Sequence, residues 1–572
     1  MPGGTLDGGS TAGRQVFTNL ELTGIVFQYL KDETLKEADT IQFGMPMSLP
    51  TSWKQFFARL ACINRAFFHA SIDVLWENMH SLEPFFGVLL PADRNPDSSL
   101  FKPLSYYPGV TSAQWDRFKF YSTRTKYLAL HRSTSPGLSS AWALFLSTDK
   151  GKPDPLFPAL KDLYLTSDDA LSLLVAFSVV PQLKLLSIDL DDESDEDSGA
   201  AITTALRTRA TRLSCLRLIN PADKHTAGRS FSIASLTSLY LALRGTTTEV
   251  PWANMHRLHR LERFELKQTL NADESSEVPS LADIAQHLSR PSPFPGMSEL
   301  AVEASSSMQY QVASSVSPHS LKRVHLKVLA SNPYEQMLVL PHVLTVHMKR
   351  NPSLITLIAE CPHRGEINPD AISHLRGDLR YNKIEPLISG LSALRNLTTL
   401  KISGLPFLAV DIMIRLLDAL RSLSQLEVLW LNPKSMTHLE ADGLLVPSLH
   451  SLQGISRNNQ RLVQCFLLVD YSAIPDLPVD YVSTNRLKHL DLYHPDYFED
   501  FENTSTDQKL RMARYLDRLF PCLKTITNHV PHGSWAWAMW SEVEKILLSF
   551  QDLRAQAIRD FAALPNALPV EG

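Results

Sequence analysis

One pattern of apolar positions recurs along the chain from about residue 157 onward. Apolar residues stand first, fourth and sixth in a short segment, as Leu160, Leu163 and Leu165 do in FPALKDLYLT. Later copies are PQLKLLSIDL, TRLSCLRLIN, ASLTSLYLAL, HRLERFELKQ, PGMSELAVEA, HSLKRVHLKV, PSLITLIAEC, RNLTTLKISG, SQLEVLWLNP, NRLKHLDLYH and PCLKTITN. With a weak copy at Leu449, thirteen anchors lie between Leu160 and Leu523. KYLALH, residues 126–131, is an earlier and degenerate copy.

The spacing of the anchors, about 30 residues on average, lies near the upper end of the range for leucine-rich repeats. The fourth and sixth positions of a strand share one face, so both can enter a core. Segments between the copies have helical spacing, for example residues 410–423, where Ile414, Leu417 and Leu420 can share one stripe. Repeated strand–helix units bury their apolar faces by stacking. We therefore predict an α/β fold, an irregular leucine-rich-repeat solenoid (horseshoe) with parallel strands on its concave side.

The alternative fold is an ordinary doubly wound α/β domain. More than ten copies of one pattern exceed the strands that a single open sheet normally contains, which favours the solenoid. The asparagine expected about three residues after the sixth position is absent, since Asp168, Asp191 and Pro221 stand there. We therefore expect irregular turns and variable repeat lengths.

In such a solenoid the residues between the anchors line the concave face, where a protein target would bind. Trp430 is the most informative of them, because exposed tryptophans often dominate the binding energy of protein interfaces. If the strand were rotated, Leu429 would be exposed and Trp430 would be core. The predicted concave-face residues are Tyr164, Asp189, Arg217, Tyr240, Glu265, Lys267, Glu303, His325, Lys327, Lys401, Trp430, Asp491 and Tyr493.

Composition excludes several classes of protein. Leucine accounts for 89 of the 572 residues, and the repeat explains this excess. Lys+Arg number 55 against 60 Asp+Glu, so no basic surplus favours nucleic acid or an anionic membrane as the partner. No apolar run approaches the length of a membrane span, and the N-terminal residues do not resemble a secretory signal. Five widely spaced cysteines indicate reduced thiols, and hence a cytoplasmic or nuclear location.

Residues 16–80 have a different pattern, with two helical blocks and no repeat copy. The first, TNLELTGIVFQYL, places Leu22, Ile25, Val26 and Leu30 on one helical face. The second, FARLACINRAFFHASIDVLWENM, places Leu60, Ile63 and Phe67 on one stripe. Trp76 follows at the end of an apolar run, where a large indole usually packs in a core, so we expect it to pack the last helix of the block against the linker.

These blocks resemble an F-box, the helical module that docks a substrate receptor onto the Skp-type adaptor of a cullin ubiquitin ligase. The matching residues are Glu21-Leu22, Ile25, Tyr29-Leu30, Arg59-Leu60-Ala61, Ile63, Arg65, Phe67 and Asp73-Val74-Leu75-Trp76. The resemblance implies that Leu22, Ile25, Leu30, Leu60 and Ile63 contact the adaptor or hold the helices that do. It extends to fungal F-box proteins with irregular leucine-rich repeats, through residues 81–91 and 111–131 and the solenoid.

The sequence departs from the F-box pattern at three places. Thr18-Asn19 replaces the usual Leu-Pro, and Asn64 replaces a common cysteine. Residues 31–56 stand where the family has a short turn, and we expect a loop or a short extra helix there. The alternative for residues 16–80 is a helical cap that covers the open end of the solenoid.

The predicted organisation is a disordered N-terminus (1–15), the F-box-like module (16–80), linker helices (81–120), the solenoid (121–530), a capping helix (531–560) and a disordered tail (561–572). No nucleophile elbow, phosphate loop, dinucleotide turn or zinc helix is found. The nearest approach to a thiol–imidazole pair is Cys361-Pro362-His363, but adjacent placement does not put the imidazole where it can accept the thiol proton. We expect no cofactor, no metal and no catalytic residue. The resemblance to F-box proteins implies, as the leading function, a non-catalytic receptor subunit of a ubiquitin ligase that binds an unknown protein target. The alternative is a leucine-rich-repeat interaction scaffold without a ligase role.

Overall fold

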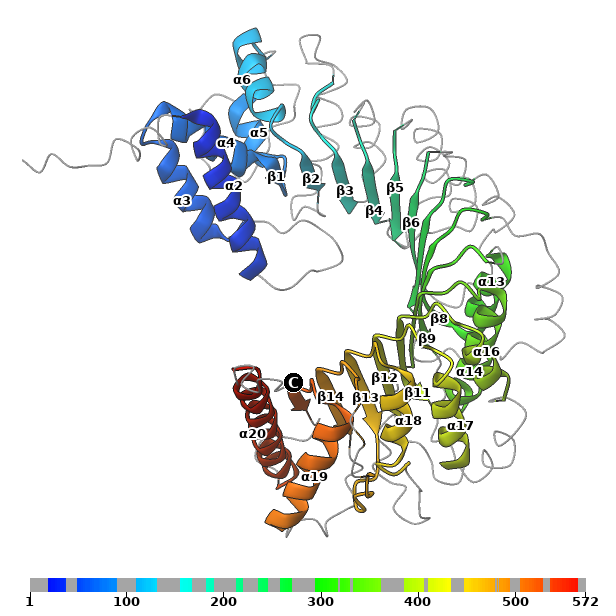
Figure 1. Cartoon of the computed structure of the whole chain (residues 1–572). Helices are drawn as coiled ribbons and strands as arrows, with labels where there is room; N and C mark the ends of the chain where they lie inside the picture. The colour runs from blue at the N-terminus through cyan, green and yellow to red at the C-terminus, as the bar shows by residue number, and fades with distance from the viewer. Residues whose placement is uncertain are drawn as a thin grey trace, which may run out of the picture. The chain divides into compact units, whose positions relative to one another are not determined.

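The structure is a computed structural model of the whole chain (Figure 1). It describes residues 19–37, 49–89, 110–130, 155–166, 182–189, 212–219, 235–244, 258–269, 294–316, 319–329, 333–361, 385–405, 410–433, 447–478, 481, 483–493, 505–527 and 535–563. The chain divides into two compact units. The first comprises residues Met1–Leu243 and Val250–Arg260, and the second comprises Arg244–Glu249 and Leu261–Gly572.

The first unit begins with helices and continues as parallel strands. The helices are α2 (Leu20–Glu37), α3 (Thr51–Ala61), α4 (Arg65–Glu77), α5 (Glu83–Leu89) and α6 (Ser112–Ser122). The strands are β1 (Asn78–Met79), β2 (Tyr127–Leu130), β3 (Asp162–Thr166), β4 (Leu185–Asp189), β5 (Cys215–Ile219) and β6 (Ser238–Arg244). Each strand pairs in parallel with the next one along the chain.

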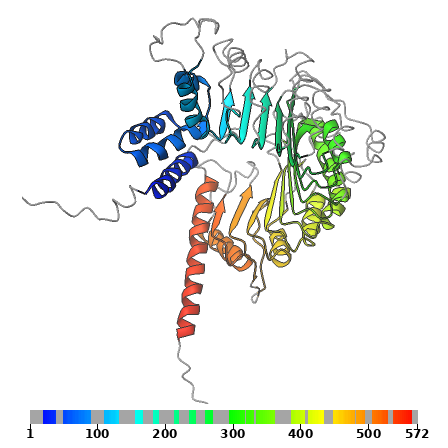
Figure 2. The ribbon, with the colours of Figure 1, turned by 90° about the horizontal axis from the view of Figure 1, so that it is seen from above.

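The second unit alternates parallel strands and helices. Its strands are β7 (Arg263–Thr269), β8 (Glu299–Ser305), β9 (Arg323–Leu329), β10 (Thr356–Glu360), β11 (Thr399–Leu405), β12 (Val428–Pro433), β13 (Gln464–Leu468), β14 (His489–Tyr493) and β15 (Thr525–Thr527). Its helices are α13 (Ser306–Ser315), α14 (Pro333–Arg350), α16 (Glu385–Ser392), α17 (Val410–Leu420), α18 (Ser451–Asn458), α19 (Thr506–Leu519) and α20 (Trp535–Ala563). Helices α13 to α18 lie along one face of these strands (Figures 1 and 2).

The repeat pattern is confirmed by the strands and by burial. All strand pairs that the structure describes are parallel, and strand order follows chain order from β1 to β15. The anchors of β3, Leu160, Leu163 and Leu165, are each 0% exposed, and the corresponding anchors of the later strands are buried in the same way. KYLALH forms β2, as expected. The protein is therefore an α/β repeat solenoid built on a long parallel sheet.

The prediction for Leu449 was wrong. Leu449 is buried next to the start of α18 and anchors no strand. The strand of this repeat is β13, and its anchors are Leu462, Cys465 and Leu467. The copy was missed because Cys465 takes the place of leucine at the fourth position. A buried thiol can do this because free cysteine packs as a small apolar residue.

Buried amides do stabilise the turns, but they precede the strands instead of following them. The side chain of Asn459 donates to the carbonyl oxygens of Leu420 and Leu423, both at 2.9 Å. Asn485 donates to the carbonyl oxygen of Asn459 at 2.9 Å and accepts from the amide N–H of Leu487 at 2.9 Å. These bonds satisfy buried carbonyl groups near the ends of helices, which otherwise lack partners.

The helical module, α2 to α4, differs from the sequence prediction at its insert. Residues 31–37 continue α2 and residues 51–56 form the first half of α3, so neither segment is a loop; residues 38–48 lie outside the described ranges. The second helical block is also two helices, so Leu60, Ile63 and Phe67 do not share one stripe. The break occurs because Asn64 caps α4 by accepting the N–H of Phe67 at 2.8 Å.

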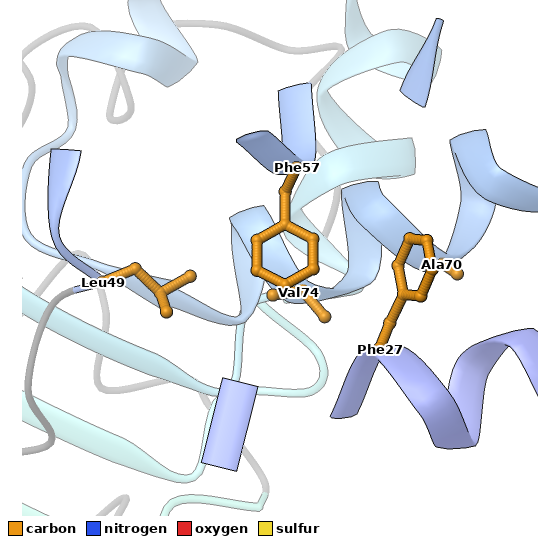
Figure 3. Close-up of a cluster of buried hydrophobic side chains, with 5 residues drawn as sticks. All are labelled: Phe27, Leu49, Phe57, Ala70 and Val74. Atoms are coloured by element: carbon orange, nitrogen blue, oxygen red, sulfur yellow. The ribbon is translucent and has the colours of Figure 1, made fainter. Parts of the chain in front are cut away.

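Five buried side chains form the centre of the helical module: Phe27, Leu49, Phe57, Ala70 and Val74 (Figure 3). The Phe27 ring lies 5.7 Å from that of Phe57 and 5.3 Å from that of Phe67, measured between centroids. Helices α2 and α3 therefore both pack on α4. Across the described residues, no helix combines the length and apolar content that crossing a bilayer requires.

Candidate functional site

Large apolar side chains are concentrated on the surface of the helical module. Seven of the fourteen exposed large apolar side chains among the described residues lie between residues 20 and 63: Leu20, Leu22, Ile25, Val26, Tyr29, Phe56 and Ile63. Exposed apolar residues scattered singly are normal, but a concentration of them marks an interaction surface. We call these seven side chains the exposed apolar set.

Helix α2 has one buried face and a second, exposed face that is apolar. Thr23, Phe27 and Lys31 recur at every fourth position and are buried against the module. Leu22, Ile25, Val26 and Tyr29 follow the spacing i, i+3, i+4, i+7, which places them together on another face. They are 42%, 61%, 40% and 63% exposed. The module's own core therefore does not account for these side chains.

The five predicted adaptor contacts separate into two groups. Leu22, Ile25 and Ile63 belong to the exposed apolar set, Ile63 being 62% exposed. Leu30 and Leu60 are partly buried and pack against the module's core. The prediction that Leu30 shares a face with Leu22 and Ile25 is therefore wrong. Leu30 lies toward the buried face of α2 that contains Phe27. The exposure of Leu20 and Phe56 was missed, because a single apolar residue at a helix start or beside an aromatic core residue has no distinctive pattern.

A charge cluster joins the module to the first repeat. Glu77, at the end of α4, accepts hydrogen bonds from Lys31 of α2 and from Lys126, the latter at 3.1 Å. The side chains of Lys31 and Glu77 are 6% and 15% exposed. Burial opposes ionisation of Glu77, but the two lysines outweigh it, so its pKa lies below the usual 4.5. Through these bonds Glu77 connects α2 and α4 to Lys126, the residue that precedes β2.

Aromatic side chains make a second connection between the module and the repeats. Trp76 stacks on Tyr121 of α6 with centroids 4.2 Å apart and meets Phe85 of α5 edge-on at 4.9 Å. Phe85 in turn contacts Phe157, just before β3, at 5.0 Å. The prediction that Trp76 packs the last helix of the module against the linker is therefore confirmed.

Replacing Glu77 with glutamine should destabilise the module by about 3 kcal/mol, because Lys31 would stay buried without its counter-charge. Hydrogen exchange of the α2 amides measures this. Since the folded-state pKa of Glu77 is depressed, the carboxylate's contribution is complete above pH 4.5 and is lost as pH falls through the folded-state value. The difference between the two proteins should therefore vanish in acid. The double variant Lys31→Met/Glu77→Leu should recover most of the loss; an equal loss in both variants would refute the assignment.

The predicted concave-face residues lie on the face of the strands opposite the leucine anchors, which we call the open face. In the first unit, register aligns Tyr164, Ser187, Arg217 and Tyr240 on neighbouring strands. Tyr164 and Tyr240 are only 2% and 7% exposed, contrary to the expectation of accessible side chains. Arg217 lies over the Tyr240 ring at 4.5 Å, and burial raises the pKa of Tyr164. Neighbouring long side chains on adjacent strands thus cover one another.

In the second unit the open face begins with two rows of alternating charge. Glu299 bridges Arg263 at 3.9 Å and Arg323 at 2.9 Å. Glu303 bridges Lys267 at 3.6 Å and Lys327 at 2.6 Å. Between the rows lie Glu265, which pairs with Arg263 at 3.6 Å, and His325, whose ring lies 3.7 Å from Glu360. These charges largely neutralise one another across neighbouring strands, so the rows favour no single charge in a partner.

Beyond the charged rows the open face becomes aromatic. Register aligns Lys401, Trp430, Phe466 and Asp491 on β11 to β14. Trp430 stacks on Phe466 with centroids 4.2 Å apart, and the Lys401 ammonium lies 5.9 Å from the Trp430 ring. Leu429 is 1% exposed, so the rotated-strand alternative is wrong. Trp430 is half-buried, Phe466 and Asp491 are buried, and the Tyr493 side chain lies outside the described set.

All five cysteines are in the reduced, thiol form. Cys465 is buried, and burial raises the pKa of its thiol, which disfavours the reactive thiolate. Cys361 is buried, and the neighbouring Pro362 and His363 lie outside the described ranges. Within those ranges, no three His, Cys, Asp or Glu side chains are grouped so as to hold a metal ion.

Comparison with known proteins identifies no family. No protein-family model matches the chain, and no curated protein matches it in sequence. A solved structure from the yeast Rad7 and Elc1 complex aligns with 68% of this chain and 94% of its own, at 13% identity and a TM-score of 0.28. A structure from the TLR13–ssRNA13 complex aligns with 66% of this chain and 57% of its own, at 14% identity and a TM-score of 0.25. Likeness at this level does not indicate a shared partner or activity.

Proposed function

We propose that the chain is a substrate-recognition subunit of a cullin-type ubiquitin ligase. The helical module docks onto a Skp-type adaptor, and the open face of the repeats binds a protein target. The observation that carries the proposal is the exposed apolar set on a module that already has a complete core of its own. The ligase supplies the chemistry, and this chain supplies proximity by holding the target near a ubiquitin-charged enzyme.

The exposed apolar set favours docking over the alternative of a simple cap. A cap buries its apolar side chains against the repeat that it covers. Here the repeats are joined to the module through Glu77, Trp76 and helices α5 and α6. Ile25, Tyr29 and Ile63, each more than 60% exposed, take no part in that junction. Burying several such side chains would yield roughly 1.5–3 kcal/mol each, enough to support a stable interface.

The charge cluster and the aromatic contacts support the same proposal. A receptor subunit must hold its target at a fixed distance from the ligase, because positioning is its contribution to the rate. Two independent sets of contacts, one through Glu77 and one through Trp76, hold the module against the start of the repeats. A helical cap would be held against the repeats in the same way, so the junction is consistent with the proposal, and the exposed apolar set is the feature that distinguishes the two functions.

Binding of the purified full chain to a Skp-type adaptor tests the proposal. The expected result is a one-to-one complex with a Kd in the nanomolar to low micromolar range, measured by calorimetry. An adaptor variant that lacks the segment that binds F-boxes serves as the control, and it should not bind the chain. Absence of binding by the intact adaptor would refute the ligase role and leave the interaction scaffold.

Trp430 is the proposed anchor for the target. Truncating a central tryptophan of an interface typically costs at least about 2 kcal/mol, or roughly 30-fold in affinity. Some ubiquitin-remnant peptides will be abundant only in cells that contain the wild-type chain. In cells that carry Trp430→Ala, the abundance of these peptides should decrease about as much as it does when the chain is deleted. Ile414→Ala, at an exposed position on α17 along the helical face, is the matched control and should leave them unchanged. If the same peptides were equally abundant with Trp430→Ala, this part of the open face would be excluded as the binding site for the target.

A further inference from the structure

Lys401 differs from the other basic side chains on the open face of the second unit. Four of these have a glutamate carboxylate within 4.0 Å: Arg263, Lys267, Arg323 and Lys327. Among the described residues, no carboxylate lies that close to the Lys401 ammonium, which lies 5.9 Å from the centre of the Trp430 ring. That distance is at the outer limit of a cation–π contact. The positive charge of Lys401 is therefore left for a partner.

The side chains that directly surround Lys401 are neutral. On its own strand, Thr399 and Ser403 stand two residues to either side and share the open face. On the neighbouring strands, register places Ile358 of β10 and Trp430 of β12 beside it. An anion bound to the Lys401 ammonium would therefore have hydroxyl groups and apolar surface as its nearest neighbours.

A carboxylate fits this position better than a phosphate. One ammonium balances the single charge of an aspartate or glutamate side chain, whereas a phosphate carries nearly two charges and is typically bound by arginine clusters. Glu360 stands diagonally across on β10, since register pairs it with Ser403. Its carboxylate repels a doubly charged group more strongly than a singly charged one.

The Trp430 ring adds an apolar half to the same position. Phe466 stacks on it with the ring centroids 4.2 Å apart and the planes inclined by 16°. Phe466 is 0% exposed, so it holds the indole in a fixed orientation. Trp430 itself is half-buried, and part of its ring faces solvent. A rigid indole with accessible surface favours contact with an aliphatic or aromatic side chain.

We propose that Lys401 and Trp430 form one subsite for an acidic peptide segment of the target. The Lys401 ammonium binds the carboxylate of an aspartate or glutamate, and the Trp430 ring binds a nearby apolar side chain. Strands β11 and β12 are about 4.8 Å apart, so two residues close together in one segment can reach both groups. The inference rests on the proposed function only in that a protein target binds the open face.

Selection of a random peptide library, displayed on phage, on the purified and immobilised full chain tests the proposal. Acidic residues within two positions of an apolar residue should be enriched about tenfold, the factor expected from one hydrogen bond to a charged group. Lys401→Glu should reverse the preference and enrich lysine and arginine. Lys327→Met is the matched control, because Glu303 already neutralises Lys327, and it should keep the acidic preference.

Fluorescence anisotropy with one selected peptide measures the contact itself. Replacing the acidic residue of the peptide with its amide should weaken binding about tenfold to the wild type but less than about twofold to Lys401→Met. Lys401→Met gives this comparison without placing a second carboxylate near Glu360. Phosphoserine at the acidic position should bind no more tightly than the carboxylate. A gain of about tenfold or more would overturn the assignment to a carboxylate.

Two other results would overturn the subsite: a library that yields no acidic and apolar pairs, or the same selection with Lys401→Glu as with the wild type. These results are separable from the adaptor test. If the adaptor does not bind but the selection depends on Lys401, the ligase role fails and the subsite stands. If the adaptor binds and the selection does not depend on Lys401, the ligase role stands and the subsite fails.

Discussion

Adaptor binding should fall at least about 100-fold when Ile25 or Ile63 is replaced by aspartate, while the chain remains folded. Both side chains are more than 60% exposed, so a charge there costs little in the free protein. In the complex the same charge would be buried in an apolar interface without a partner, which is strongly unfavourable. Calorimetry with the purified adaptor gives the Kd, and hydrogen exchange of the α4 amides reports whether the module stays folded.

The matched control is Ile414→Asp, which makes the same chemical change at a 44% exposed isoleucine on α17. It should bind the adaptor as the wild type does. Leu60→Asp is unsuitable as a test of docking, because Leu60 packs against the module's core and a charge there would unfold the module. If Ile25→Asp and Ile63→Asp both kept the wild-type Kd, the exposed apolar set would not be the adaptor surface.

Replacing Phe57 with alanine should destabilise the helical module by about 4 kcal/mol, the range found for large aromatic residues in cores. Phe57 is fully buried, and its ring lies within 6.0 Å of those of Phe27, Phe56 and Trp53. The cavity would separate α3 from both other helices of the module (Figure 3). Exchange of the α2, α3 and α4 amides should accelerate by roughly three orders of magnitude, while the amides of β7 to β15 should be unaffected.

The neighbouring Phe56 provides the control on the same helix. Phe56 is 42% exposed, so Phe56→Ala should cost less than about 1 kcal/mol in the module. Because Phe56 belongs to the exposed apolar set, this variant should weaken adaptor binding without accelerating exchange. Phe57→Ala should do both. If the two variants had the same effect on exchange, the placement of Phe57 in the core would be wrong.

The repeat architecture could be predicted from sequence because it rests on a local rule. Positions four and six point to one face of any strand, so Leu163 and Leu165 had to be buried together whatever the rest of the chain did. The rule failed at β13, because Cys465 stands at the fourth position in place of leucine. The pattern predicted Leu449, which precedes α18, as the anchor instead. The rule also failed on α17, where Ile414 is exposed and Met413, Leu416, Leu417 and Leu420 form the buried stripe. Helical spacing shows which residues lie on the same side of a helix, but it does not show which side of the helix faces the sheet.

The candidate sites were only partly predictable. Sequence placed Trp430 between two buried anchors, but its stacking on Phe466 depends on the register between β12 and β13. Tyr164 was expected to be accessible, yet it is buried, because Tyr127 packs beside it from the adjacent strand β2 and the side chain of Arg217 reaches it from β5, across the small Ser187 of β4. A pattern along one strand carries no information on how long the adjacent side chains are. Such contacts arise between residues far apart in sequence.

The sequence by itself determined the alternation of strands and helices, the leucine anchors of the parallel sheet and the separate helical character of residues 20 to 77, because each depends on short-range periodicity. The tertiary structure decided which apolar side chains of α2 face inward. Phe27 packs on Phe57 and Phe67, and this leaves Ile25 and Tyr29 in solvent. It also decided that α20 extends past α19. Both outcomes depend on where neighbouring elements end, which periodicity along one helix does not specify.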